Sequence, residues 1–201
     1  MNVPNRRMRS RPAIAINRIP SQDSLSREPL ALLYEEHVAQ VKRWAYRLAG
    51  PSADLEDMVH DIFVIALTKH FEWRGEATID TWLFAITNKV VRSKRRRRRM
   101  RDMLLGRRRD ELMPPAPSTP QQDVEQREQL TRLYRALDRL SDRERTTLVL
   151  YELEDLSGER VAALTGSTVG AVWVRLHRGR ERLAALLAQE DAEEGKVVAP
   201  K

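Results

Sequence analysis

A proline-rich string divides this chain into two parts that have to fold separately. Four of its ten prolines lie in PPAPSTPQQ, at residues 114–122. Proline fixes φ and lacks a backbone N–H, so this string can hold neither the interior of a helix nor a central strand. The sequence therefore predicts a linker over residues 106–123, with one folded domain on each side of it.

Apolar residues recur at three-and-four spacing on both sides of this linker, which is the period of a helix that buries one face. Aromatic residues make up only 5% of the chain, and Leu, Ala and Arg dominate it, which favours helices over sheets. We expect an all-α fold of two small helical domains, at residues 28–105 and 124–188. A basic arm at residues 1–27 and a tail at residues 189–201 lack a sustained period, and we expect the arm to be mobile and the tail to be frayed.

The second domain carries the pattern of a helix-turn-helix. Ser141 with Glu144 predicts a capping box for a helix that runs through TTLVLYELEDL, and Ser157 predicts the cap of a short helix. A tight turn at Gly166 leads to a longer basic helix, expected from about Val169 to Ala188. A short helix, a turn with glycine and a longer basic helix are typical of DNA-binding proteins of this class. A basic helix on a purely structural bundle is the alternative.

The outward face of that longer helix can contact DNA in two ways. Arginines can read guanine edges, for about 1–3 kcal/mol of discrimination per good bidentate pair, or they can clamp phosphates without reading sequence. The candidate residues on this face are Thr168, Ala171, Trp173, Val174, Arg175, His177, Arg178 and Arg180.

The positive charge is concentrated in two segments of an otherwise mildly acidic chain. Residues 1–27 carry six arginines and one aspartate, and residues 94–109 carry ten Lys and Arg and one aspartate, within a net charge of +7. This placement does not fit a general nucleic-acid coat. The run from Arg95 to Arg99 repels itself at every helical spacing, so we expect it to be a stable helix only if anions cover it. For the basic arm, a solvated tail and a contact with nucleic acid both stay open.

The stretch that precedes the arginine run has an acidic helix face and an aromatic loop. In DLEDMVHDIF, Asp54, Asp57 and Asp61 share one face, which is either solvated or the contact of a partner. In FEWRGEAT, aromatic rings beside cationic residues suit unpaired bases, which stack at about 1–3 kcal/mol each. Phe71 and Trp73 fit a small core under a loop equally well.

The residues present do not indicate an enzyme. The absence of cysteine excludes disulfides and thiolate zinc sites, and suits a reducing cytoplasm. The histidines show no ligand spacing, and there is no nucleophile elbow or glycine-rich phosphate loop. Asp57 and Asp61 alone are too few carboxylates for the Mg²⁺ site of a nuclease. We expect no catalysis, no cofactor and no small-molecule substrate, and the apolar runs are too short for insertion into a membrane.

Two long segments resemble bacterial extracytoplasmic-function (ECF) sigma factors of the sigma-70 family. Residues 29–100, which include DLEDMVHDIFVIALTKHFEWRGEATIDTWLFAITNKVVRSKRRRR, resemble their second conserved region. Residues 124–188, which include LDRLSDRERTTLVLYELEDLSGERVAALTGSTVGAVWVRLHRGRERL, resemble their fourth. The resemblance implies an alternative sigma factor, cytoplasmic and nucleoid-associated, that binds core RNA polymerase, directs it to specific promoters and assists promoter melting.

The resemblance also implies partners and contact residues. The DLEDMVHDIF helix matches the surface that grips the clamp of the polymerase β′ subunit, which gives polymerase contacts to Asp54, Asp57, His60 and Asp61. The WRGEAT loop matches the part that captures a base flipped from the minus-ten element, and the next helix lies beside that DNA. The minus-ten candidates are Phe71, Trp73, Arg74, Gly75, Asn88, Lys89, Arg92, Arg95 and Arg96. The helix from Thr168 to Arg180 matches the reader of the minus-35 element. The implied partners are core RNA polymerase, through its β′ clamp and β subunits, promoter DNA and an anti-sigma factor.

Some positions depart from the family. Ala171, Trp173 and Val174 stand where it often has a threonine and then a Lys-Ser pair, and Ser167 takes a place that is usually apolar. Phosphate contacts and promoter preference at this helix therefore stay open. Two other functions also stay open: a helix-turn-helix regulator that binds duplex DNA without joining polymerase, and an RNA-binding adaptor that uses the arginine run.

Overall fold

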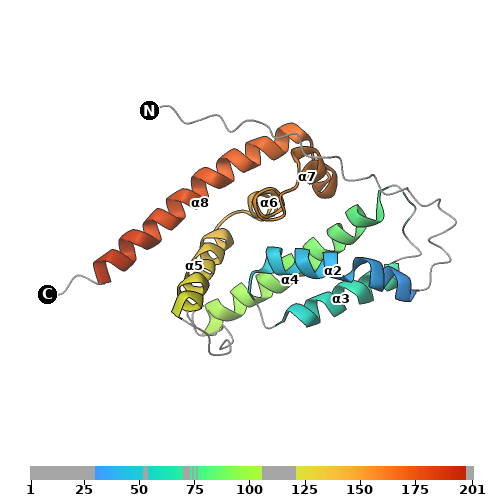
Figure 1. The fold of residues 1–201 in the computed structure, drawn as a ribbon, viewed down its shortest axis with the longest axis horizontal. Coiled ribbons are helices and arrows are strands. Elements are labelled where there is room, and N and C mark those ends of the chain that lie inside the picture. Colours follow the sequence, from blue (N-terminus) through green and yellow to red (C-terminus); the bar gives the residue numbers. More distant parts are fainter. Residues whose placement is uncertain are drawn as a thin grey trace.

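The structure is a computed structural model that describes residues 30–51, 54–69, 73, 75, 77–105 and 121–197. Within these ranges every regular element is a helix, which confirms the expected all-α fold (Figure 1). The helices are α2 (Leu30–Ala49), α3 (Leu55–Lys69), α4 (Ile79–Leu105), α5 (Gln121–Asp138), α6 (Asp142–Leu148), the π-helix η3 (Val149–Leu153), α7 (Gly158–Thr165) and α8 (Val169–Val197). The expected arm at residues 1–27 lies outside the described residues, as does the expected linker except for its last three residues, which begin α5.

Helices α2, α3 and α4 pack on one another as a first helical group. Their apolar stripes meet in a core where Ile62 and Phe84 are buried and Trp44 stands edge-on to Phe84, with ring centroids 5.2 Å apart. Burial of each such side chain contributes about 1.5–3 kcal/mol. Tyr34 of α2 is 46% exposed, and its ring lies beside that of Phe63.

The second helical group, α5 to α8, has the predicted caps. The side chain of Ser141 accepts a hydrogen bond from the Glu144 amide, and the Glu144 carboxylate accepts one from the Ser141 amide, which completes the capping box of α6. Ser157 caps α7 in the same way without the second bond. Gly166 ends α7 in the left-handed region, at φ 59°, where glycine is favoured. The helix-turn-helix of α7 and α8 is therefore formed as predicted.

Two elements of this group differ from the sequence prediction. The segment after Ser141 was expected to be one helix, but α6 ends at Leu148 and continues as η3, after which Asp155 has a positive φ of 55°. Helix α8 runs to Val197, well beyond the expected end near Ala188, and α5 contacts it close to that expected end. Arg132 of α5 donates to the carbonyl of Leu187 at 3.1 Å and its Nε lies 3.7 Å from a carboxylate oxygen of Glu190.

The two helical groups lie side by side, with α4 against α7 and α2 against η3 (Figure 1). At one contact the ring of Tyr134 lies on Gly50, where a Cβ would stand 2.6 Å from Cδ1 of the ring. The hydroxyl of Tyr134 donates to the carbonyl of Arg47 at 3.1 Å. Burial raises the pKa of Tyr134 to about 12, so this hydroxyl keeps its proton at neutral pH. Among the described residues no helix is long and apolar enough to cross a membrane.

Candidate functional surfaces

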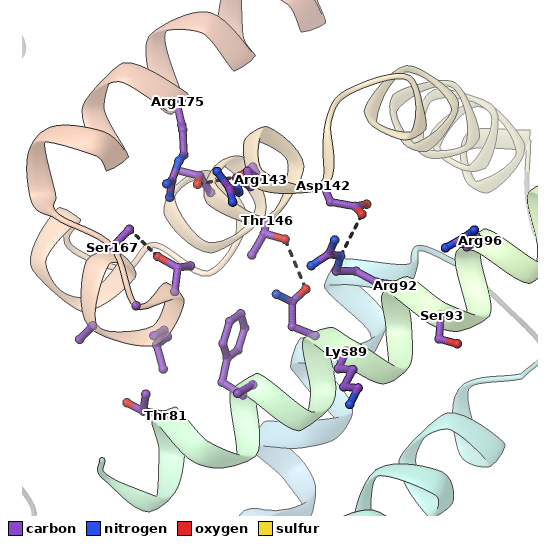
Figure 2. Close-up of a pocket in the computed structure, with 18 residues that line it drawn as sticks. Thr81, Lys89, Arg92, Ser93, Arg96, Asp142, Arg143, Thr146, Ser167 and Arg175 are labelled. Atoms are coloured by element: carbon purple, nitrogen blue, oxygen red, sulfur yellow. Dashed lines mark hydrogen bonds and ion pairs between the residues drawn. The ribbon is translucent and has the colours of Figure 1, made fainter. Parts of the chain in front are cut away.

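A cleft of about 890 Å³ opens between α4 and the second helical group, beside the contact of α4 with α7 (Figure 2). The lining from α4 includes Asn88, Lys89, Arg92, Ser93 and Arg96, and the lining from the second group includes Asp142, Arg143, Thr146, Ser167 and Arg175. The structure thus brings four minus-ten candidates to one cleft with a minus-35 candidate. Five of these lining residues are Lys or Arg, so the cleft is strongly cationic.

Carboxylates of the second group reach the arginine run of α4. Arg95 donates from Nε and Nη2 to Oδ1 of Asp138, at 3.2 and 2.9 Å, and from Nη1 to Oδ1 of Asp142, at 3.3 Å. Arg92 Nε donates to Oδ2 of Asp142 at 2.9 Å, across the cleft (Figure 2). Arg99 donates to the backbone carbonyl of Asp138. The sequence predicts that anions must cover the run if it is to be helical, and these two aspartates supply them to Arg95, Arg98 and Arg99.

The cluster around Asp138 is buried. The side chains of Arg95 and Asp138 are 6% and 8% exposed, and Arg145, which donates to Oδ1 of Asp138 at 2.7 Å, is 1% exposed. Burial and then the charge of Arg99 lower the pKa of Arg95 to about 10, so it still carries its charge at neutral pH. Burial likewise lowers the pKa of Arg98. Arg95 was predicted to contact minus-ten DNA, and here it lies inside the protein instead.

Further polar contacts join the two groups. Arg145 donates from Nε and Nη2 to the carbonyl of Leu48, at the end of α2, at 3.1 and 2.7 Å. The buried carboxylate of Glu154 accepts from Arg43 Nε at 3.0 Å. Arg160 of α7 donates to Asp80 of α4 at 2.7 Å. Most of these bonds run from arginines of one group to oxygens of the other.

The polymerase-contact candidates of α3 lie apart from the cleft. Asp57 and His60 are exposed. Asp61 forms an ion pair with Lys94 of α4, with Nζ 2.8 Å from Oδ2. Asp54 precedes the helix and lines, with Asp57, a smaller groove of about 330 Å³ whose opposite wall is the arginine run.

Only part of the aromatic loop lies within the described residues. Trp73 is half-buried and its ring centroid lies 6.3 Å from that of Trp82. Its indole N–H is buried and has no hydrogen-bond partner among the described residues. Gly75 is exposed, with φ 73°. Phe71 and Arg74 lie outside the described residues. Base stacking and a small core under the loop therefore both stay open for these aromatic residues.

The candidates on α8 fall into three sets. Trp173 and Val174 are about half exposed, and Trp173 also packs edge-on against Tyr151 of η3, with centroids 5.5 Å apart. Arg180 is held by η3, with Nε 2.7 Å from a carboxylate oxygen of Glu152 and its guanidinium over the Tyr151 ring. The remaining candidates are Thr168, whose hydroxyl caps α8 by accepting from the Ala171 amide, Ala171 itself, Arg175 in the cleft, and the exposed His177 and Arg178.

Several residues of these surfaces were not found from the sequence. Asp138, Asp142 and Arg145 contact residues of the first group that lie between 43 and 97 positions away. No local pattern distinguishes an aspartate that ends a helix from one that pairs with a distant arginine. Arg143 lines the cleft, and its charge is the only feature of the sequence that indicates a role at this surface.

Two family models match the chain, and related proteins match most of its length. Sigma-70 region 2 matches residues 33–101 and Sigma-70, region 4 matches residues 130–183. The ECF RNA polymerase sigma factor SigE of Mycolicibacterium smegmatis is 34% identical over 176 residues, which are 87% of this chain and 65% of SigE. The RNA polymerase sigma factor CnrH of Cupriavidus metallidurans is 30% identical over 161 residues, which are 77% of this chain and 84% of CnrH. This chain therefore spans less than two thirds of the length of SigE.

Solved structures of similar fold contain two proteins bound to each other. The structure of CnrH in complex with the cytosolic domain of CnrY matches with a TM-score of 0.55 and 25% identity, over 83% of this chain and 94% of that one. The sigma factor RpoE of Bartonella quintana, in complex with the anti-sigma factor NepR, matches with a TM-score of 0.54 and 24% identity, over 79% of this chain and 96% of that one. The second likeness shows the fold alone.

Proposed function

Because this chain belongs to the ECF sigma factors of the sigma-70 family, which direct RNA polymerase to initiate transcription, we propose a division of labour between its two helical groups. The first group binds polymerase and the minus-ten element, and the second binds the minus-35 element. We place the domain boundaries at residues 28–105 and 124–188. The observation that carries the proposal is that one chain presents an acidic face on α3, a cationic face on α4 and a helix-turn-helix.

The polymerase contact is assigned to α3. Asp57 and His60 are exposed on this helix, and Asp54 stands beside them at its start. Exposed carboxylates grouped on one helix suit a cationic partner surface, where they would steer association and fix its register. Asp61 contributes once its ion pair with Lys94 is exchanged for a contact with polymerase.

The minus-ten contact is assigned to the cleft-facing side of α4. Lys89, Arg92 and Arg96 are exposed there, and Asn88 stands with them. Cationic residues along one helix neutralise successive phosphates, while an asparagine can hydrogen-bond a base edge. The aromatic loop before α4, with Phe71, Trp73, Arg74 and Gly75, would hold a flipped base, whose stacking offsets the few kcal/mol of unstacking.

The minus-35 contact is assigned to α8, with an apolar element at its centre. Trp173 and Val174 are each about half exposed on the helix that would enter the major groove. Apolar side chains there contact the C5-methyl group of thymine. Arg175 and Arg178 supply charge on the same helix. We therefore expect a minus-35 element with thymines opposite Trp173 or Val174.

An anti-sigma factor is the regulatory partner that the relatives suggest. CnrH was solved with the cytosolic domain of CnrY, and RpoE with the anti-sigma factor NepR. The chain would act in the cytoplasm beside the nucleoid, where polymerase and promoters are found, and it would have no catalytic activity of its own. The regulator and RNA-adaptor alternatives give no account of the match to sigma-70 region 2.

Run-off transcription with purified core RNA polymerase tests the proposal. The full chain is added to core polymerase on fragments that carry promoters of its own genome, and transcripts are mapped. We expect discrete start sites that depend on the added chain. If core polymerase starts at no new position on any native template, the chain is not an initiation factor. Duplex binding without such starts would instead support the regulator.

A further inference from the structure

We propose that Asp138 and Asp142 are an internal substitute for DNA phosphates on the arginine run of α4. They hold the two helical groups closed, and DNA has to displace them before α4 and the helix-turn-helix can both be used. The inference rests on the proposed function, because it assigns a means of regulation to the same α4 surface.

The geometry of Arg95 carries the first step. All three of its guanidinium nitrogens donate to carboxylates of the second group, two to Asp138 and one to Asp142. The fork of donors that arginine presents to a carboxylate is the same fork that it presents to a phosphate. Three of its five N–H groups are taken up by these bonds, and the side chain is buried, so Arg95 cannot present its fork of donors to DNA while the bonds persist. Arg92 is engaged in the same way through its Nε and Asp142.

The charge of the run carries the second step. Neighbouring arginines from Arg92 to Arg99 repel one another along one helix, and the charge of Arg99 adds to burial in lowering the pKa of Arg95. Asp138 also lies 3.7 Å from Arg98 and 3.9 Å from Arg99, so one carboxylate serves several arginines. If the carboxylates leave, the helical run needs other anions. Phosphates of a nucleic-acid backbone meet that need, so the closed and DNA-bound arrangements exchange one set of anions for another.

The cleft shows why the exchange has to open the molecule. Lys89 and Arg96 of α4 and Arg175 of α8 line the same cleft of about 890 Å³ (Figure 2). Elements centred near positions minus ten and minus 35 lie about 85 Å apart along duplex DNA, at about 3.4 Å per base pair. Side chains that line one cleft cannot reach both elements. The closed arrangement is therefore incompatible with reading the two elements together, whereas the exposed Asp57 of α3 stays accessible to polymerase.

Binding of the free full chain to a fluorescein-labelled oligo-dT tests the exchange. Oligo-dT offers phosphates without a promoter sequence. The variant is Asp138→Asn with Asp142→Asn, and the matched control is Glu35→Gln with Glu36→Gln, which removes the same two charges from the exposed side of α2. We expect the variant to bind about tenfold more tightly than the wild type, about 1.4 kcal/mol, and the control to bind within about twofold of it. Equal affinities of variant and control would overturn the proposal.

A distance measurement keeps the test decisive if the buried Asp138 cannot be replaced without loss of the fold. The chain has no cysteine, so dyes can be attached at Val64→Cys of α3 and Ala188→Cys of α8, both exposed positions. Energy transfer should fall when oligo-dT is added, and Asp142→Asn alone, at a half-exposed position, should shift that change to lower oligo-dT concentrations. If energy transfer does not change when oligo-dT is added, the proposal is wrong. In that case, promoter-specific transcription by the same wild-type chain would still support the proposed function. Absence of transcription would count against the proposed function and not against the exchange of anions.

Discussion

Arg95 and Asp138 form a buried ion pair, with Nη2 2.9 Å from Oδ1, between helices that belong to different halves of the chain. The sequence marks Arg95 only as one of a run of arginines that DNA would attract. The structure gives Arg95 an internal partner. By our proposal, the arginine run pairs with aspartates in the closed protein and with phosphates in the DNA-bound protein.

Replacing the buried Arg145 should destabilise the closed chain. Arg145→Met removes two hydrogen bonds to the carbonyl of Leu48 and one to Asp138, and leaves both oxygens buried. Loss of one partner from such a buried cluster costs about 3–5 kcal/mol. Urea unfolding followed by circular dichroism measures the free energy of unfolding. Arg143→Met, at an exposed neighbouring position, should change it by no more than about 0.5 kcal/mol, and equal midpoints would contradict the assigned role.

The capping box of α6 should give a pH-dependent contribution to stability. Hydrogen bonds from Ser141, first of all from its side chain, lower the pKa of Glu144 from its ordinary value of 4.5. A carboxylate with a lowered pKa stabilises the fold fully above its ordinary pKa, and that contribution is lost as the pH falls through the lowered value. Ser141→Ala should therefore cost about 1 kcal/mol at pH 7 and progressively less below about pH 4.5. Thermal unfolding across this range checks it.

The control for this prediction is Thr168→Ala. The hydroxyl of Thr168 caps α8 by accepting from the Ala171 amide at 3.2 Å, and no carboxylate takes part in that bond. The loss in free energy of unfolding caused by Thr168→Ala should therefore be the same at pH 7 and at pH 4. Parallel behaviour of the two variants would show that the Glu144 carboxylate adds nothing to the cap of α6.

Removing two carboxylates from α3 should weaken binding to polymerase alone. Asp57→Ala with Asp61→Ala is expected to reduce the affinity for core RNA polymerase about tenfold, because charges at such an interface each contribute of the order of 1 kcal/mol. Binding of the full chain to duplex DNA should not fall. Glu56→Ala is the control, because that exposed carboxylate pairs with Lys42 of α2. Fluorescence anisotropy of the labelled chain gives both affinities, and a joint loss would argue against separate surfaces.

On α8, two neighbouring arginines should differ in their effect on promoter binding. Both side chains are exposed, but that of Arg180 is held by Glu152 and the ring of Tyr151. Arg178→Ala should weaken binding of the polymerase complex to promoter DNA by about 1–3 kcal/mol if it reads a base, and Arg180→Ala should have a smaller effect. Filter binding on a mapped promoter measures both. The reverse order would place the DNA on the other side of α8.

The sequence predicts what depends on neighbouring residues. The period of α2 and α3, the capping box at Ser141 and the turn at Gly166 are set by residues within a few positions of one another, and the structure has them all. Helix α8 ends beyond the expected Ala188, and the pairing of Arg132 of α5 with Glu190 in that region joins distant parts of the chain that no local pattern marks. The cluster at Asp138 was missed for the same reason, since its members meet only after the two groups pack.

The contact between Gly50 and Tyr134 makes closure depend on the volume of a single methyl group. The ring occupies the space of the missing Cβ, and the φ of +85° at this glycine strains any other residue. Gly50→Ala would act as a steric wedge that opens the two groups while every charge stays in place. A wedged chain would therefore show how much of the restraint on DNA binding comes from shape and how much from the exchange of anions.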